Sequence, residues 1–355
     1  MAQTRFNFSG KAVIPKKSSR PFYEERTKGD MQTRRINFAV SSSENNMAFV
    51  ESFGCTMDTI NTIDIDGNKM TVDWDDRFDE DVVRQVANYR KYVVDFGRDY
   101  EGRHEFITAY DMIGYVADII EEIDGDIIVT GQISREYYKG KYYNHFRISN
   151  IYLKTKDSNN ALSVVADIYY NKDCIDIADW RKEKIIRVNG YIRQYVNRDE
   201  GNKFIPQEFV FNASKINEED EEQKKALDVR LKYLKDVPDE FVSLRWNMKL
   251  LNGAEEIEFD ESQLTKAQRE MVDAGISSVD DYRPNGSILG TRITEFRLNK
   301  PSLIGNYADG FLSTDLTDKE FKAEIYNPPV EENLDDVIAG NVSTLEDDDN
   351  DDLFA

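Results

Sequence analysis

Cysteine and histidine are scarce in this chain. Its 355 residues include two cysteines, Cys55 and Cys174, and two histidines, His104 and His145. Two cysteines far apart in sequence supply neither a disulfide framework nor a zinc cluster. A histidine base for nucleophilic catalysis has only two candidates. His145 lies in the strand-like run KYYNHFRI, where we expect a structural or ligand-facing role.

Nucleotide-binding motifs and long apolar runs are also missing. The sequence contains no G-x-x-x-x-G-K-[ST], no G-x-G-x-x-G and no H-E-x-x-H. No stretch approaches the ~18 apolar residues of a membrane-spanning helix, and the first residues, MAQTRFNFSGKAV, lack an apolar signal core. We therefore expect a soluble, cytoplasmic protein that is not an enzyme and that has no cofactor, no metal site and no membrane partner.

Positive charge is low overall but concentrated in two blocks. The net charge of −22 alone argues against nucleic-acid binding, because phosphate binding needs lysine and arginine. However, residues 1–35 hold nine basic and three acidic residues, and residues 127–215 hold fifteen and ten. Residues 323–355 hold eleven acidic residues and no basic one. The two positive blocks of so acidic a chain require a functional explanation.

Alternating apolar patterns predict a mainly β protein with inserted helices. The runs TRRINFAV and NNMAFVESFG predict one hairpin, and TIDIDGNKMTVDW predicts a second with Asp66 and Gly67 in its turn. Apolar residues three or four apart predict helices over 78–96 and 105–122. VSLRWNMKLLNGAEEIEF predicts a further hairpin, and GTRITEFRLNKP predicts a last strand.

Two segments share a pattern that indicates a duplicated β-barrel module. IIVTGQISREYY resembles IIRVNGYIRQYV, and FRISNIYL resembles FVFNASKI. Each copy has a glycine inside its first strand, Gly131 or Gly190, and a strand glycine permits the bend that a small coiled barrel needs. We predict an N-terminal domain over 1–156, a second domain over 157–326 and a disordered acidic tail over 327–355.

Tyrosines alternate with cations along these predicted strands. Alternate residues of a strand share a face, so Tyr191, Arg193 and Tyr195 form one row. Exposed rings stack on unpaired bases of any sequence, and neighbouring cations neutralise phosphates. The pattern predicts stacking by Tyr137, Tyr143, Tyr191 and Tyr195, phosphate contacts by Arg135, Lys139, Lys141, Arg187, Arg193 and Arg198, and a clamp of Lys16, Lys17 and Arg20. The tyrosines could instead pack between the two modules.

The chain ends in LEDDDNDDLFA, a run of carboxylates followed by two apolar residues. This tail and the barrel pattern over 127–216 resemble the OB-fold single-stranded DNA-binding proteins of bacteria and phages, in a phage-type version with two barrels. The resemblance implies sequence-tolerant binding of single-stranded DNA during replication, recombination or repair, in the cytoplasm of a bacterial host if the protein is phage-encoded. It also implies that replication or recombination proteins bind Asp347, Asp348, Asp349, Asp351, Asp352, Leu353 and Phe354.

Two other interpretations stay open. The protein could be a virion structural or scaffolding protein without nucleic-acid binding, whose tyrosines are packing residues and whose tail keeps it soluble. It could also be a metal-dependent nuclease that uses the carboxylates of residues 73–81. These acidic residues are better explained as the first turn of a helix, where the helix dipole favours negative charge.

Overall fold

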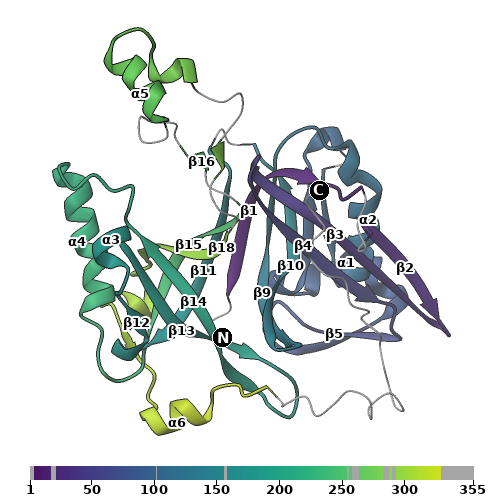
Figure 1. Ribbon diagram of the computed structural model, residues 1–355. Helices are drawn as coiled ribbons and strands as arrows, with labels where there is room; N and C mark the ends of the chain where they lie inside the picture. The colour runs from purple at the N-terminus through teal and green to yellow at the C-terminus, as the bar shows by residue number, and fades with distance from the viewer. Residues whose placement is uncertain are drawn as a thin grey trace.

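The structure is a computed structural model that describes residues 4–16, 21–100, 102–155, 158–253, 264–282 and 293–328, together with the backbone of 256–257 and 288–289. Most of its strands belong to one sheet of fifteen strands, which coils into two lobes (Figure 1). The prediction of a mainly β protein with inserted helices is therefore confirmed. Apart from its first two residues, the predicted disordered tail lies outside the described residues.

Five strands form the first barrel. β1 (Arg5–Val13) pairs with β3 (Met31–Ser43) and β9 (Ile127–Tyr138), β3 pairs with β4 (Asn46–Cys55), and β9 pairs with β10 (Lys141–Leu153), all antiparallel. The barrel closes where Arg147 of β10 pairs in parallel with Glu51 of β4. α2 (Ala109–Ile119) lies between β4 and β9 in the chain and packs against β3 and β4. This strand order matches the five-stranded Greek-key barrel of the OB-fold.

A second set of five strands repeats this topology. β11 (Ala161–Tyr170) pairs with β13 (Ile185–Tyr195) and β15 (Val242–Gly253), β13 with β14 (Asn202–Asn212), and β15 with β18 (Ile293–Pro301), again antiparallel. The parallel pair of Val210 in β14 and Arg297 in β18 closes this barrel. α4 (Glu221–Lys235) stands between β14 and β15 in the chain. Antiparallel pairing of β1 with β11 joins the two barrels.

Shorter elements decorate the barrels. The strands are β2 (Tyr23–Lys28), β5 (Thr59–Ile63), β6 (Lys69–Asp73), β7 (Tyr92–Asp95), β8 (Arg103–Phe106), β12 (Ile175–Asp176), β16 (Glu256–Ile257), β17 (Ile288–Leu289) and β19 (Leu312–Ser313). The helices are α1 (Glu80–Gln85), α3 (Trp180–Glu183), α5 (Lys266–Asp273) and α6 (Asp318–Ala323). Single 3₁₀ turns are η1 (Trp74–Phe78), η2 (Asn88–Arg90), η3 (Arg98–Tyr100), η4 (Ile120–Glu122), η5 (Lys172–Cys174), η7 (Val279–Tyr282) and η8 (Gly305–Tyr307).

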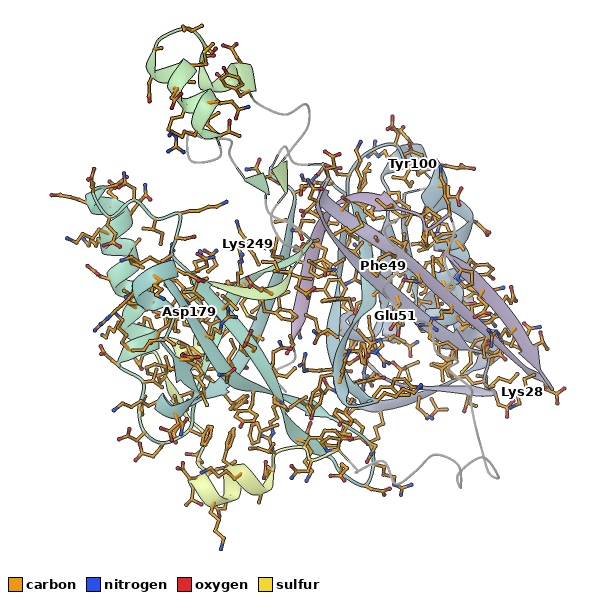
Figure 2. All side chains as sticks on the ribbon, in the orientation of Figure 1. Lys28, Phe49, Glu51, Tyr100, Asp179 and Lys249 are labelled. Atoms are coloured by element: carbon orange, nitrogen blue, oxygen red, sulfur yellow. The ribbon has the colours of Figure 1, made fainter. Side chains whose placement is uncertain are left out.

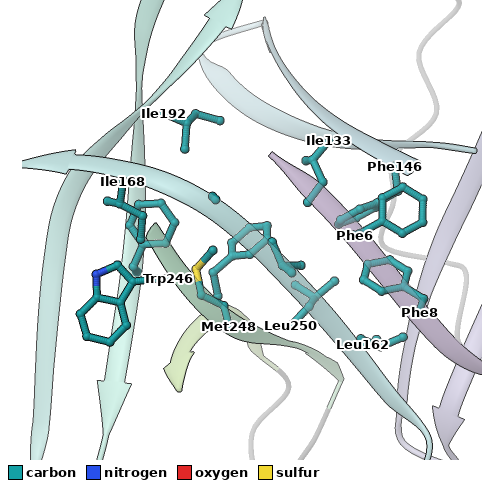
Figure 3. Close-up of a cluster of buried hydrophobic side chains, with 14 of the residues drawn as sticks. Phe6, Phe8, Ile133, Phe146, Leu162, Ile168, Ile192, Trp246, Met248 and Leu250 are labelled. Atoms are coloured by element: carbon teal, nitrogen blue, oxygen red, sulfur yellow. The ribbon is translucent and has the colours of Figure 1, made fainter. Parts of the chain in front are cut away.

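One apolar core runs through both barrels (Figure 3). Phe6, Phe8 and Phe146 pack together in the first barrel, with ring centroids 4.5 to 5.7 Å apart. Trp246 and Met248 are buried in the second barrel. Because successive residues of a strand point to opposite faces, the residues directly before and after each buried residue point to the outer face of the barrel.

Two predicted elements are wrong and four are confirmed. The predicted hairpins are β3–β4 and β5–β6, the helix predicted over 105–122 is α2, and the predicted last strand is β18. The predicted helix over 78–96 is wrong, because α1 ends at Gln85 and residues 92–95 are strand β7, which pairs with β10. Valine-rich segments fit a strand as well as a helix, so the partner strand decides. The hairpin predicted to start at Val242 is a single strand, β15, whose partners are β11 and β18.

The two segments aligned from the sequence occupy different places in their barrels. β9–β10 is the fourth and fifth strand of the first barrel, whereas β13–β14 is the second and third strand of the second. Gly131 is required by close approach, because a Cβ there would lie 1.9 Å from the carbonyl oxygen of Arg147. The register of the partner strand shifts next to it, between Ile148 and Asn150.

Candidate nucleic-acid interface

The outer face of the β13–β14 hairpin carries the predicted row of aromatic and basic residues. Ile192 points into the barrel and is buried, so Tyr191, Arg193 and Tyr195 share the opposite face. Tyr195 is 57% exposed. The guanidinium carbon of Arg193 lies 5.6 Å from the centroid of the Phe204 ring. This hairpin presents one free ring and one cation side by side.

The segment that contains α6 covers the other end of this row. Phe321 of α6 is fully buried, and its ring centroid lies 3.8 Å from that of Phe241, 4.0 Å from that of Phe204 and 5.5 Å from that of Tyr191. Burial raises the pKa of the Tyr191 hydroxyl. Tyr191 is therefore a partly buried packing residue in this structure, whereas Tyr195 is open to solvent.

The β9–β10 hairpin divides the predicted residues between two faces. Its turn consists of Lys139 and Gly140, with φ of 45° and 80°. Tyr137 therefore pairs with Tyr142, and Tyr143 pairs with Glu136. Arg135 and Tyr137 lie on one face of the hairpin, and Lys141 and Tyr143 lie on the other. The structure does not bring Tyr143 together with Tyr137.

The outer face of β3, β4 and β10 carries two aromatic residues that were not predicted from the sequence, Phe49 and Phe53, beside the predicted Tyr143. Phe53 is 62% exposed, and Tyr143 of β10 is 38% exposed on the same side of the barrel. Figure 2 labels Phe49 and Glu51 on β4, which belong to the same outward row as Phe53. Glu51 could have revealed this row from the sequence. A carboxylate in the alternating run NMAFVESFG marks the row that faces outward, and Phe49 and Phe53 have its parity.

Charged side chains are ordered on this face. Arg35 Nη2 donates to Glu51 Oε2 at 2.6 Å, and His145 Nδ1 lies 2.7 Å from Glu51 Oε1. Next to them, Arg147 Nη2 donates to Glu136 Oε1 at 2.7 Å. Burial of Glu51 opposes its ionisation, but the hydrogen bonds from His145 and Arg35 outweigh it and lower the pKa of Glu51 to about 2. The carboxylate is therefore ionised and holds both partners in place.

Arg135 lies where the two hairpins meet. Its backbone N–H donates to Gln194 Oε1 of β13 at 2.7 Å, and Gln194 Nε2 donates to the Arg135 carbonyl oxygen at 3.0 Å. Its Nη1 donates to Asn144 Oδ1 at 3.0 Å and to Gln207 Oε1 of β14. Its guanidinium carbon lies 5.0 Å from the centroid of the Tyr142 ring. This contact brings the candidate residues of both barrels into one region.

The remaining predicted cations are scattered. Arg187 pairs with Asp179 at 3.7 Å and with Glu208 at 3.3 Å. Arg198 is exposed in the loop of the β13–β14 hairpin, and Lys16 is exposed after β1. Lys17 and Arg20 lie outside the described residues, as do the predicted tail contacts Asp347, Asp348, Asp349, Asp351, Asp352, Leu353 and Phe354.

Among the carboxylates of residues 73–81, Asp79 has a structural role. Asp79 caps α1, because its side chain accepts from the backbone N–H groups of Asp81 and Val82. Within the part of the chain that the structure describes, no group of three histidine, cysteine, aspartate or glutamate side chains could hold a metal ion. None of the described helices is long and apolar enough to cross a membrane.

Comparisons with known proteins add little to this geometry. No family model and no curated protein matches the chain. The chain is similar to the crystal structure of a deletion mutant of the single-stranded DNA-binding protein from Thermus aquaticus, with 10% identity and a TM-score of 0.30, over 70% of this chain and 87% of that one. A likeness at this TM-score supports no argument, so the fold assignment rests on the strand pairings.

Proposed function

We propose that this protein binds single-stranded DNA without strong sequence preference, through the outer faces of its two barrels. One observation carries the proposal. The second and third strands of each barrel, β3–β4 and β13–β14, display an exposed aromatic ring, Phe53 or Tyr195, with an arginine on the same face. In OB-folds this strand pair and the adjoining loops bind oligonucleotides.

The chemistry of these faces suits an unpaired strand. A base that stacks on an exposed ring contributes ~1–3 kcal/mol whatever its identity, because every base has a π face. Lys141 at the tip of β10 and Arg193, whose Nη2 also lies 3.7 Å from Glu324 Oε2, supply charge for the phosphates. Duplex DNA offers its bases only at the groove edges, so stacked rings favour the single strand.

The finer proposal concerns the biological process. We propose that binding serves DNA replication, recombination or repair, and that the acidic tail, with Leu353 and Phe354 at its tip, recruits partner proteins. An acidic run with a small apolar tip suits a weak contact that charge steers toward a basic surface. The protein would then bind DNA and recruit partners without catalysing a reaction itself.

The test is a salt titration with a fluorescent oligothymidine and a duplex of equal length. We expect steep weakening with salt, preference for the single strand, and a loss of roughly 5- to 150-fold in affinity for Phe53→Ala and for Tyr195→Ala. Tyr89→Ala is the matched control, because Tyr89 is 71% exposed and lies in η2, which belongs to neither strand pair. Wild-type protein that binds neither nucleic acid, or a control as damaging as the two variants, would refute the proposal. Concentration-dependent assembly in the absence of DNA would favour the scaffolding alternative.

A further inference from the structure

The charge of Arg135 has no counter-charge among the described residues. The side-chain groups that contact its guanidinium are the amide oxygens of Asn144 and Gln207 and the ring of Tyr142, all of which are neutral. Its Nε is shielded from solvent and has no acceptor. Burial lowers the pKa of Arg135 to about 10. By contrast, Arg245 in the second barrel donates to both oxygens of Asp167, at 2.6 and 3.0 Å.

A partly buried cation without an anion is costly, because the protein replaces its hydration with weaker dipoles. The hydrogen bonds of Nη1 to Asn144 and Gln207 also fix the plane of the guanidinium. Within the described part of the chain no group accepts from Nη2. Nη2 is therefore the donor left for a ligand, and a charge-assisted hydrogen bond from it to a phosphate oxygen is stronger than a hydrogen bond between neutral groups.

The surroundings of Arg135 also suit a nucleotide. Tyr137 and Tyr142 lie on the same face of the β9–β10 hairpin as Arg135, and their ring centroids are 5.0 Å apart. The bond from Arg135 to Gln207 and the contact with Gln194 place the second barrel directly beside it. A phosphate at Arg135 would thus lie between the aromatic residues of one barrel and the outer strands of the other.

We propose that Arg135 binds a phosphate of one DNA strand that passes from the first barrel to the second, so that both barrels share a single continuous strand. This inference rests on the proposed function and deepens it, because it assigns the strand a path. Lys141 and Tyr143 lie on the opposite face of the hairpin and therefore contact a different part of the strand.

The experiment compares the full-length variants Arg135→Met, Arg135→Lys and Arg84→Met in oligothymidine binding at graded salt and in urea unfolding. Met matches the length of the apolar stem but removes the charge. Lys keeps the charge but replaces the fixed planar guanidinium with a flexible ammonium group. Arg84 is the control, because it is 70% exposed, pairs with Glu80 and Asp81, and lies on α1, which belongs to neither strand pair. The free energy of unfolding is measured without DNA.

Arg135→Met should weaken binding about tenfold at low salt and reduce the slope of log K against log salt by about 0.7, the share of one phosphate of a single strand. Its stability in urea should be unchanged or higher, because an uncompensated charge has been removed. Arg135→Lys should retain the salt slope, and Arg84→Met should match the wild type in DNA binding.

Three results would overturn the inference while wild-type binding is intact. The first is an unchanged salt slope with lower stability in Arg135→Met, which would mean that Arg135 only stabilises the contact between the barrels. The second is an equal loss of slope in Arg84→Met, which would reflect net charge alone. The third is tighter DNA binding by Arg135→Met, which would mean that the acidic tail of this chain is the anion that Arg135 holds. If wild-type protein fails to bind, the proposed function itself fails.

Discussion

Replacing Phe321 with alanine should release the segment that covers Tyr191. Phe321 is fully buried, and its ring stacks on Phe241 with an angle of 7° between the planes and on Phe204 with an angle of 22°. Truncation of a buried phenylalanine costs ~3–5 kcal/mol. α6 has six residues, too few to persist as a free helix, so its docking depends on this side chain. We expect the docking free energy of the segment to fall by about 3–5 kcal/mol.

Amide hydrogen exchange is the decisive assay, because the segment can open without global unfolding. The backbone N–H of Phe204 donates to the Glu324 carbonyl oxygen at 3.0 Å, and that of Tyr326 donates to the Phe204 carbonyl oxygen at 2.9 Å. In Phe321→Ala both amides should exchange at least about a hundredfold faster. Phe53→Ala, which truncates an exposed ring, should change stability by no more than about 0.5 kcal/mol. Unchanged protection at these two amides would refute the view that Phe321 anchors the segment.

Two further predictions concern stability. The pKa of Glu51 is lowered from 4.5 to about 2 in the folded protein by hydrogen bonds from His145 and Arg35, so its stabilisation is complete above about pH 4.5 and is lost as the pH falls through 2. Glu51→Gln should therefore reduce the loss of unfolding free energy between about pH 4.5 and pH 2, by up to about 3 kcal/mol. Urea unfolding at graded pH measures this loss. An equal loss in the wild type and the variant would contradict the prediction. Gly131→Ala should destabilise the fold by more than about 3 kcal/mol, because its Cβ would lie 1.9 Å from a backbone oxygen. Gly190→Ala, whose Cβ would meet its nearest neighbours at 3.0 Å, should cost less in the same unfolding assay.

Local patterns predicted several features of the site. Alternation placed Tyr191, Arg193 and Tyr195 on one face, as the structure has them, because a strand repeats every two residues. The dipeptide Lys139-Gly140 also determines which residues of β9 and β10 pair. A two-residue turn there pairs Tyr138 with Lys141, which already places Tyr137 and Tyr143 on opposite faces.

Other features needed contacts between distant segments. The helix predicted over 78–96 is partly strand, because Val93 and Val94 pair with β10, more than fifty residues later in the chain. The cover over Tyr191 comes from Phe321, and no local pattern connects the two. The exposure of the Phe53 ring depends on which face of β4 packs against α2 and the core.

The sequence by itself determined the mainly β class, the β3–β4 and β5–β6 hairpins and the face on which each side chain of a strand lies, because these follow from short-range periodicity and turn chemistry. Only the tertiary structure decided which aromatic residues are open to solvent and that Arg135 lies between the barrels with no counter-charge from the residues that the structure describes. Exposure and electrostatic compensation depend on every segment that packs around a residue, and those segments are brought together only when the barrels close.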